Sequence, residues 1–174
     1  SEEGRAWIRE RLPESKATAQ AALGIFKKTL DTYGAEAQVF GNFPSLFMSL
    51  VGENGEWEHY GGLLRFGDSA GNIIADKIEH EDYASYVAEA VEPWSYLKFP
   101  YFRPMGYPEG IYRVGPLARL NLCDHIGTPQ ADSELREFRD RNHGVAKSSF
   151  QYHYARLLEI VAGLEQIEEL VDDP

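Results

Sequence analysis

The chain has 174 residues, of which 43% are hydrophobic and 26% charged, and its formal net charge at pH 7 is -11. This length and apolar fraction are sufficient for one domain with a buried core. The negative charge argues against a nucleic-acid surface, because phosphates would be repelled. No apolar run approaches the roughly 20 residues that a helix needs to span a bilayer, and the charged N-terminus lacks the pattern of a signal peptide. We therefore expect a cytoplasmic chain without nucleic acid or a membrane span.

The first segment has the pattern of a helix. Pro13 suits the first turn of a helix and Gly34 suits its end. Apolar residues recur between them at three- and four-residue steps, which is typical of one helical face. These residues are Leu23, Phe26, Leu30 and Tyr33. With a turn or two before Pro13, this predicts a helical unit over residues 1–34.

The following segment, residues 35–80, predicts a small antiparallel β-meander. A turn signal at Asn54-Gly55 and a polar run separate short apolar stretches, as in consecutive hairpins. A further short strand is expected at 57–60. The main predicted strands are 45–51, 63–66 and 73–78.

Residues 81–127 combine a short amphipathic helix with an aromatic, proline-rich loop. The apolar spacing between Tyr83 and Val91 favours the helix, and Pro93 stops it. The stretch 94–121 is too interrupted for a long helix and too apolar for a solvated linker. It is therefore expected to be ordered but irregular, and such segments often carry sites and interfaces.

Residues 128–174 predict a helical hairpin. Thr128-Pro129 is a suitable N-cap and first-turn pair for a helix that runs to about Arg141. A second, longer helix starts near Phe150 and repeats apolar residues every seven positions up to Val171. The predicted fold class is α+β and mainly helical, with long core helices framing the small meander.

No metal or nucleophile site follows from the residue types. The five histidines are scattered and form no HxxxH or HxH pair, so structural or surface roles are favoured over metal binding. Cys123 is the single cysteine, which excludes an internal disulfide and a multi-thiolate metal site built from this chain alone. An isolated cysteine is usually a small buried hydrophobe. We therefore assign no catalytic, cofactor-binding or metal-binding residue to the chain.

Three cations, Lys98, Arg113 and Arg119, lie among apolar residues, where an unpaired charge would be costly. An ion pair or a clamp on backbone carbonyls is favoured over a role in chemistry. Arg156 and Glu159, three residues apart, are expected to pair. These residues by themselves do not define a reaction.

Several motifs together resemble the large subunit of nickel–iron hydrogenases, most closely the cytoplasmic bidirectional, NAD-linked group. The string YRVGPLARLN at 112–121 is the most specific of them. The other motifs are KFPY at 98–101, GYPEG at 106–110, NFPSLF at 42–47, EHY at 58–60, GNIIAD at 71–76 and YHYARL at 152–157. The family holds its metals with two CxxC pairs, and neither pair is present. The resemblance therefore places the chain in the middle of a longer subunit, with no metal ligand of its own.

The resemblance implies a scaffold section, inactive alone, of an enzyme that reversibly oxidises dihydrogen coupled to NAD at a nickel–iron centre. Its partners would be the remainder of the large subunit and an iron–sulfur small subunit. The residues expected to surround the metal ligands or to contact another chain are Lys98, Tyr112, Arg113, Arg119 and His153.

Two other functions remain open at this point. The chain could be a non-catalytic interaction module that docks a partner through exposed aromatics. It could also be a homologue of the quinone-reducing subunit of complex I, which lacks the cysteines as well. If the last helix is excised from a larger bundle, we expect the fragment to self-associate through the aromatic loop or through the stripe Leu157, Val161 and Leu164.

Overall fold

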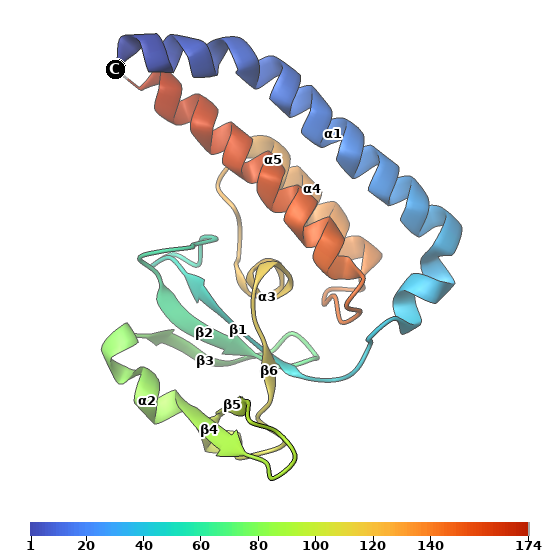
Figure 1. Cartoon of the computed structure of the whole chain (residues 1–174), viewed down its shortest axis with the longest axis vertical. Coiled ribbons are helices and arrows are strands. Elements are labelled where there is room, and N and C mark those ends of the chain that lie inside the picture. Colours follow the sequence, from blue (N-terminus) through green and yellow to red (C-terminus); the bar gives the residue numbers. More distant parts are fainter. Residues whose placement is uncertain (174) are drawn as a thin grey trace.

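A computed structural model, which describes residues 1–173, arranges the chain as a layer of three helices beside two small sheets, with a short helix between them (Figure 1). The helices of the layer are α1 (Glu2–Val39), α4 (Pro129–Arg141) and α5 (Gln151–Asp172). The short helix is α3 (Pro116–Leu122). The predicted α+β class is confirmed.

Helix α1 starts where it was predicted to start and extends beyond the predicted end at residue 34. Ser1 caps it by accepting a hydrogen bond from the amide of Gly4, so the helix starts well before Pro13. Pro13 lies inside the helix, and the dark blue part of α1 runs at an angle to the rest (Figure 1), as expected where a proline removes a backbone hydrogen bond. The backbone leaves helical geometry at Tyr33, next to the predicted end at Gly34, and a second helical stretch then continues to Val39.

Helix α4 begins at Pro129 as predicted, but Thr128 does not cap it with its side chain. The carboxylate of Glu165, on the neighbouring α5, performs this role instead. It accepts hydrogen bonds from the backbone amides of Gln130 (3.0 Å) and Ala131 (2.9 Å), which are free donors in the first turn of a helix. The hydroxyl of Thr128 donates to the same carboxylate at 2.6 Å. One buried acid therefore joins the start of α4 to the middle of α5.

The larger sheet confirms the three main predicted strands and adds a fourth. Its order is β3-β2-β1-β6, with β1, β2 and β3 antiparallel and β6 parallel to β1. The sheet is therefore mixed and not a simple meander. The strand predicted at 57–60 is absent, and only an isolated bridge between Val51 and Trp57 occurs there. The strands are β1 (Leu46–Val51), β2 (Leu63–Gly67), β3 (Ile73–Ile78) and β6 (Tyr112–Arg113).

The second sheet is a two-stranded hairpin of β4 (Val87–Val91) and β5 (Lys98–Phe102). The predicted helix over 83–91 is wrong beyond α2 (Tyr83–Tyr86), because its second half pairs with β5. The segment expected to be irregular also contains β5 itself. Pro100 is tolerated within β5 because a two-stranded sheet leaves one side of each strand unpaired. Short 3₁₀ turns at His80–Asp82 and Arg103–Met105 complete the chain.

The interior consists of two clusters. The larger one joins the three helices to α3, whose Leu117, Ala118 and Leu120 are fully buried. The smaller one lies between the sheets and includes Phe66 and Phe102, with ring centroids 4.6 Å apart. Helix α3 therefore lies where the helical layer meets the sheet (Figure 1). Within residues 1–173, no helix combines the length and hydrophobicity needed to cross a membrane.

Candidate functional site

The best organised polar site joins α3 to α5 through Arg119 and Glu159. The guanidinium donates to both carboxylate oxygens, from Nε to Oε1 at 2.5 Å and from Nη2 to Oε2 at 2.9 Å. Both side chains are largely shielded from water, with relative exposures of 21% and 11%. Two parallel charge-assisted bonds fix the geometry as well as the distance. The prediction that Arg156 pairs with Glu159 is therefore wrong, and Arg156 lies over the ring of Tyr152 instead.

The loop after β1 adds two aromatic groups to this carboxylate. The indole of Trp57 donates to Glu159 Oε1 at 2.9 Å, and His59 Nε2 lies 3.8 Å from the same oxygen. The two rings pack at a centroid distance of 4.3 Å. Burial lowers the pKa of His59, and the nearby Arg119 cation lowers it further against the opposing effect of Glu159. Glu159 is the common hydrogen-bond acceptor of Arg119 and Trp57.

A cavity of about 170 Å³ lies beside this group. Its walls include the apolar side chains of Met48, Leu50 and Val114, with His59 and Arg119 at the polar side. The guanidinium is already neutralised by Glu159, and the cavity holds no hydroxyl or thiol that is paired with a base. The arrangement can position backbone and exclude water, but it supplies no activated nucleophile.

A second site is the clamp formed by Arg113 at the end of β6. Its guanidinium donates to the hydroxyl of Ser45 at 2.7 Å and to the carbonyls of Lys147 (2.5 Å) and Phe43 (2.8 Å). It also lies over the ring of Phe47. Burial lowers the pKa of Arg113, since no carboxylate offsets the loss of solvent. The expectation of a carbonyl clamp describes this residue well.

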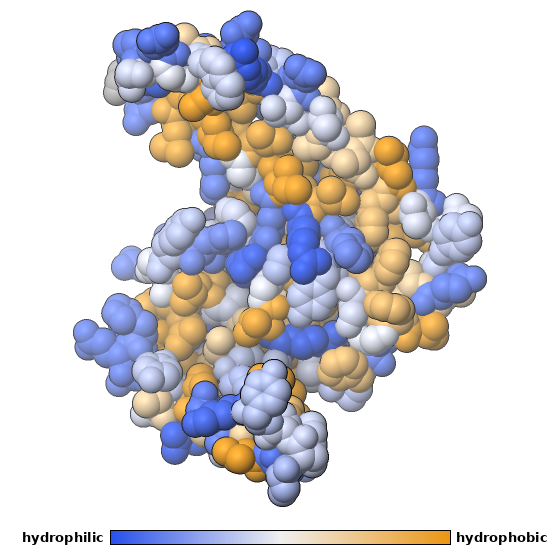
Figure 2. Space-filling model, viewed as in Figure 1, coloured by the Kyte–Doolittle hydropathy of each residue, from blue (hydrophilic) through white to orange (hydrophobic). Residues whose placement is uncertain are grey.

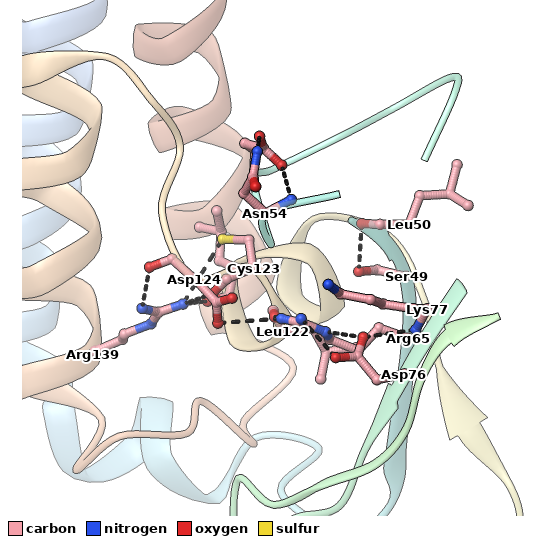
Figure 3. A network of polar contacts seen from close by, with 12 residues as sticks. Ser49, Leu50, Asn54, Arg65, Asp76, Lys77, Leu122, Cys123, Asp124 and Arg139 are labelled. Atoms are coloured by element: carbon pink, nitrogen blue, oxygen red, sulfur yellow. Dashed lines mark hydrogen bonds and ion pairs between the residues drawn. The ribbon is translucent and has the colours of Figure 1, made fainter. Parts of the chain in front are cut away.

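A third network, around Arg65, was not predicted from the sequence (Figure 3). Arg65 is 4% exposed and binds both oxygens of Asp76, at 2.7 and 3.0 Å. Its Nη1 donates to the carbonyl of Leu122 at 2.9 Å and to Asp124 at 3.2 Å. The Arg65 bond lowers the pKa of Asp76. The network therefore ties β2 and β3 to the end of α3.

The same end of α3 is held from the other side by α4. Arg139 donates to the carbonyls of Cys123 and Asp124 (3.3 Å) (Figure 3). It also donates to the carbonyl of Leu120 at 3.0 Å. Two arginines from different layers thus satisfy carbonyl groups that the short helix leaves free. A charged residue on an otherwise apolar strand, as Arg65 is on β2, was the available signal for this network.

The five residues expected to surround metal ligands or to contact another chain do not form one site. Tyr112 and Arg113 are neighbours on β6, and Arg119 belongs to the Glu159 group. Tyr112 packs edge-on against Phe66, and burial raises its pKa. Lys98 is exposed on the hairpin and pairs with Glu89 at 3.0 Å. His153 is exposed on α5 beside the rings of Phe26 and Phe150.

Cys123 is 2% exposed, and burial raises the pKa of its thiol to about 12. It is therefore protonated at neutral pH, whereas a metal ligand or nucleophile must be a thiolate. Within residues 1–173, no group of three or more histidine, cysteine, aspartate or glutamate side chains is arranged to hold a metal ion. The absence of metal-binding residues in this chain remains a prediction.

The predicted self-association stripe is turned inward. Val161 is buried, and Leu157 and Leu164 pack against the helical core. The apolar residues that α5 exposes are others, Ile160, Ile167 and Leu170. Figure 2 views the molecule from the same side as Figure 1. On this side, hydrophobic surface covers much of the helical layer, and hydrophilic groups lie across the middle of the molecule.

The chain is similar to hydrogenase subunits over most of its length. The A subunit of the F420-non-reducing hydrogenase of Methanothermobacter marburgensis is 39% identical over 153 residues, which is 87% of this chain and 31% of that protein. The beta subunit of the NAD-reducing hydrogenase HoxS of Cupriavidus necator is 35% identical over 157 residues, 90% of this chain and 32% of the relative. No protein-family model matches the chain.

A crystal structure shows the same similarity in three dimensions. The structure of an NAD+-reducing [NiFe]-hydrogenase in the H2-reduced state matches 99% of this chain and 39% of its own, with a TM-score of 0.94 and 36% identity. The chain spans about a third of the length of the curated relatives above. The described fold is therefore shared with a section of a longer hydrogenase chain.

The names of the relatives contradict the prediction that this chain is part of a nickel–iron large subunit. They designate A and beta subunits, and a relative in Archaeoglobus profundus, 35% identical over 140 residues, carries the name of an iron-sulfur subunit. The assignment to a nickel–iron large subunit is corrected accordingly, together with the partners inferred from it. The similarity to hydrogenase subunits is retained, and the choice of the large subunit is not. The interaction module and the complex I homologue do not match these relatives either.

Proposed function

We propose that this chain is a section of a hydrogenase subunit of the kind designated A or beta, and that it works within an oxidoreductase complex that interconverts dihydrogen, protons and electrons. The match over 99% of the chain at a TM-score of 0.94 and 36% identity supports this most strongly. We also propose that residues 1–173 belong to a longer polypeptide, because each relative extends well beyond the matched region.

Within that complex, we infer a scaffold role for this section. Its best organised groups are arginine clamps on carboxylates and carbonyls, which fix the position of α3 relative to the sheet and the helices. Preorganised support of this kind is what a site elsewhere in an enzyme needs. The reactive cofactors would then be bound by other residues. The charge of -11 and the single buried thiol fit a cytoplasmic location.

The test uses the native polypeptide that contains this sequence, purified with its associated subunits from the source cell. We expect the complex to reduce a redox dye when dihydrogen is supplied. Loss of the Arg119–Glu159 contact in Arg119→Met should lower the yield of assembled complex, while the activity of each assembled complex changes little. Lys98→Met removes an exposed cation on the hairpin and is the matched control.

A pure, assembled complex without dihydrogen-dependent dye reduction would refute the hydrogenase assignment. A different outcome, full assembly of Arg119→Met with greatly reduced activity per complex, would refute the scaffold role and indicate that Arg119 takes part in chemistry.

A further inference from the structure

We propose that a polar cavity between the end of α1, the β2–β3 turn and the α4–α5 loop binds a small oxyanion. The cavity has a volume of about 330 Å³. This is enough for a small anion with several waters, since one water occupies about 30 Å³ in the liquid. Gln38 lines it from α1, Asn42 from the segment after α1, Ser69 from the turn, and His143 and Lys147 from the loop.

The charge around this cavity is positive, in contrast to the chain as a whole. Lys147 lines it, no aspartate or glutamate does, and Lys147 forms no ion pair with any residue in 1–173. The clamp residue Arg113 binds the backbone carbonyl of Lys147 and has only neutral oxygen partners. The Lys147 ammonium is therefore a cation without a carboxylate partner in a protein with a net charge of -11. An anion bound in the cavity would offset this charge.

Two of the neutral groups of the cavity keep a hydrogen-bond donor available. The hydroxyl of Ser69 forms no hydrogen bond within the described chain. The Asn42 amide uses one N–H on the carbonyl of Gln38, at 2.8 Å, and keeps a second. Asp68, the nearest acid along the turn, is occupied by the backbone amides of Ala70 and Asn72. An acceptor-rich ligand such as an oxyanion matches this set of donors.

His143 reaches the rim of the cavity from the end of α4. It has φ +53°, a left-handed conformation, and Gly144 follows with φ +98°. These two residues end the helix, because their amides donate to the carbonyls of Asp140 and Arg139. The imidazole of His143 is one of the groups that line the cavity.

The experiment is a titration of the full chain with inorganic phosphate at constant ionic strength, followed by amide chemical shifts. We expect saturable shifts confined to residues around the cavity. Lys147→Gln should weaken binding at least about tenfold, as for loss of a charge-assisted hydrogen bond. Lys28→Gln removes the same charge from α1, away from the cavity, and is the control. His143→Asn keeps a residue that tolerates the left-handed backbone but removes the ring, and should also weaken binding.

A parallel titration with acetate tests whether the cavity is specific for a tetrahedral oxyanion. Saturable binding of phosphate alone supports a site for a tetrahedral oxyanion, and binding of both supports a general oxyanion site. Non-saturable shifts, or equal weakening by Lys147→Gln and Lys28→Gln, would overturn the proposal, because the effect would then be one of general charge.

Discussion

Replacing Glu165 by glutamine tests whether one buried carboxylate holds α4 against α5. The change keeps the shape of the side chain but removes the charge from three hydrogen bonds, with Thr128, Gln130 and Ala131. Hydrogen bonds to a charged group contribute about 1.5–3 kcal/mol each, and those between neutral groups about 0.5–1.5 kcal/mol. The glutamine NH2 would also face donors that it cannot satisfy, and the favourable interaction with the helix dipole would be lost.

Burial of the charged Glu165 carboxylate costs free energy, which offsets part of the stabilisation from its hydrogen bonds. We therefore expect Glu165→Gln to lower the free energy of unfolding by roughly 2–3 kcal/mol. For a chain of this size, the corresponding fall in Tm is roughly 4–12 °C. Urea denaturation followed by circular dichroism measures the free energy, and a thermal scan measures the Tm.

Glu169→Gln is the matched control, since Glu169 is exposed on the same helix and forms no ion pair with any residue that the structure describes. It should change the stability by no more than about 0.5 kcal/mol. If both variants have the same free energy of unfolding as the unmodified chain, the Glu165 carboxylate does not stabilise the contact between α4 and α5, and the reasoning fails.

Two further predictions concern groups at the C-terminal end of α3. Arg65→Met should lower the free energy of unfolding by about 2–3 kcal/mol, because it leaves the carbonyl of Leu122 and the carboxylate of Asp76 without their donor. The folded state lowers the pKa of Asp76, so this contribution is complete above the ordinary aspartate pKa of about 4 and is lost as the pH falls through the folded pKa. Urea titrations at several pH values should therefore show the difference narrowing in acid, and a constant difference would contradict the assignment. Cys123, with its pKa raised to about 12, should not react with a thiol reagent at pH 8 until urea unfolds the chain; rapid reaction of the native protein would show that the thiol is accessible.

The sequence predicted the helices whose apolar spacing is regular and whose ends are marked. Helix α4 starts at Pro129, and α5 follows the heptad rhythm to Asp172. The apolar spacing of residues 87–91 predicted a helix, but these residues form a strand. Val87 and Val91 pair with β5, and this non-local pairing outweighs the helical periodicity. Likewise, the parallel contact of β6 with β1 joins residues more than sixty positions apart, and no turn signal announces it.

The polar contacts were the least predictable part of the candidate site. Arg119 was identified as a buried cation, but its partner, Glu159, lies 40 positions further along the chain. The cap on α4 comes from Glu165, on another helix, although Thr128 has the residue type of an N-cap. Sequence reasoning could name residues that need a partner, but the partners depend on how the layers are stacked.

The position of α3 also has a consequence for how the chain opens. Its side chains are in the larger core, and its terminal carbonyls are held by Arg65 from the sheet and Arg139 from the helices. Neither layer can separate without exposing α3, so its amides should be among the slowest to exchange with deuterated water. The β4–β5 hairpin has two strands and exposes Trp94 and Tyr96, and its amides should exchange first. Local stability should thus decline from the centre of the chain's fold toward its aromatic hairpin.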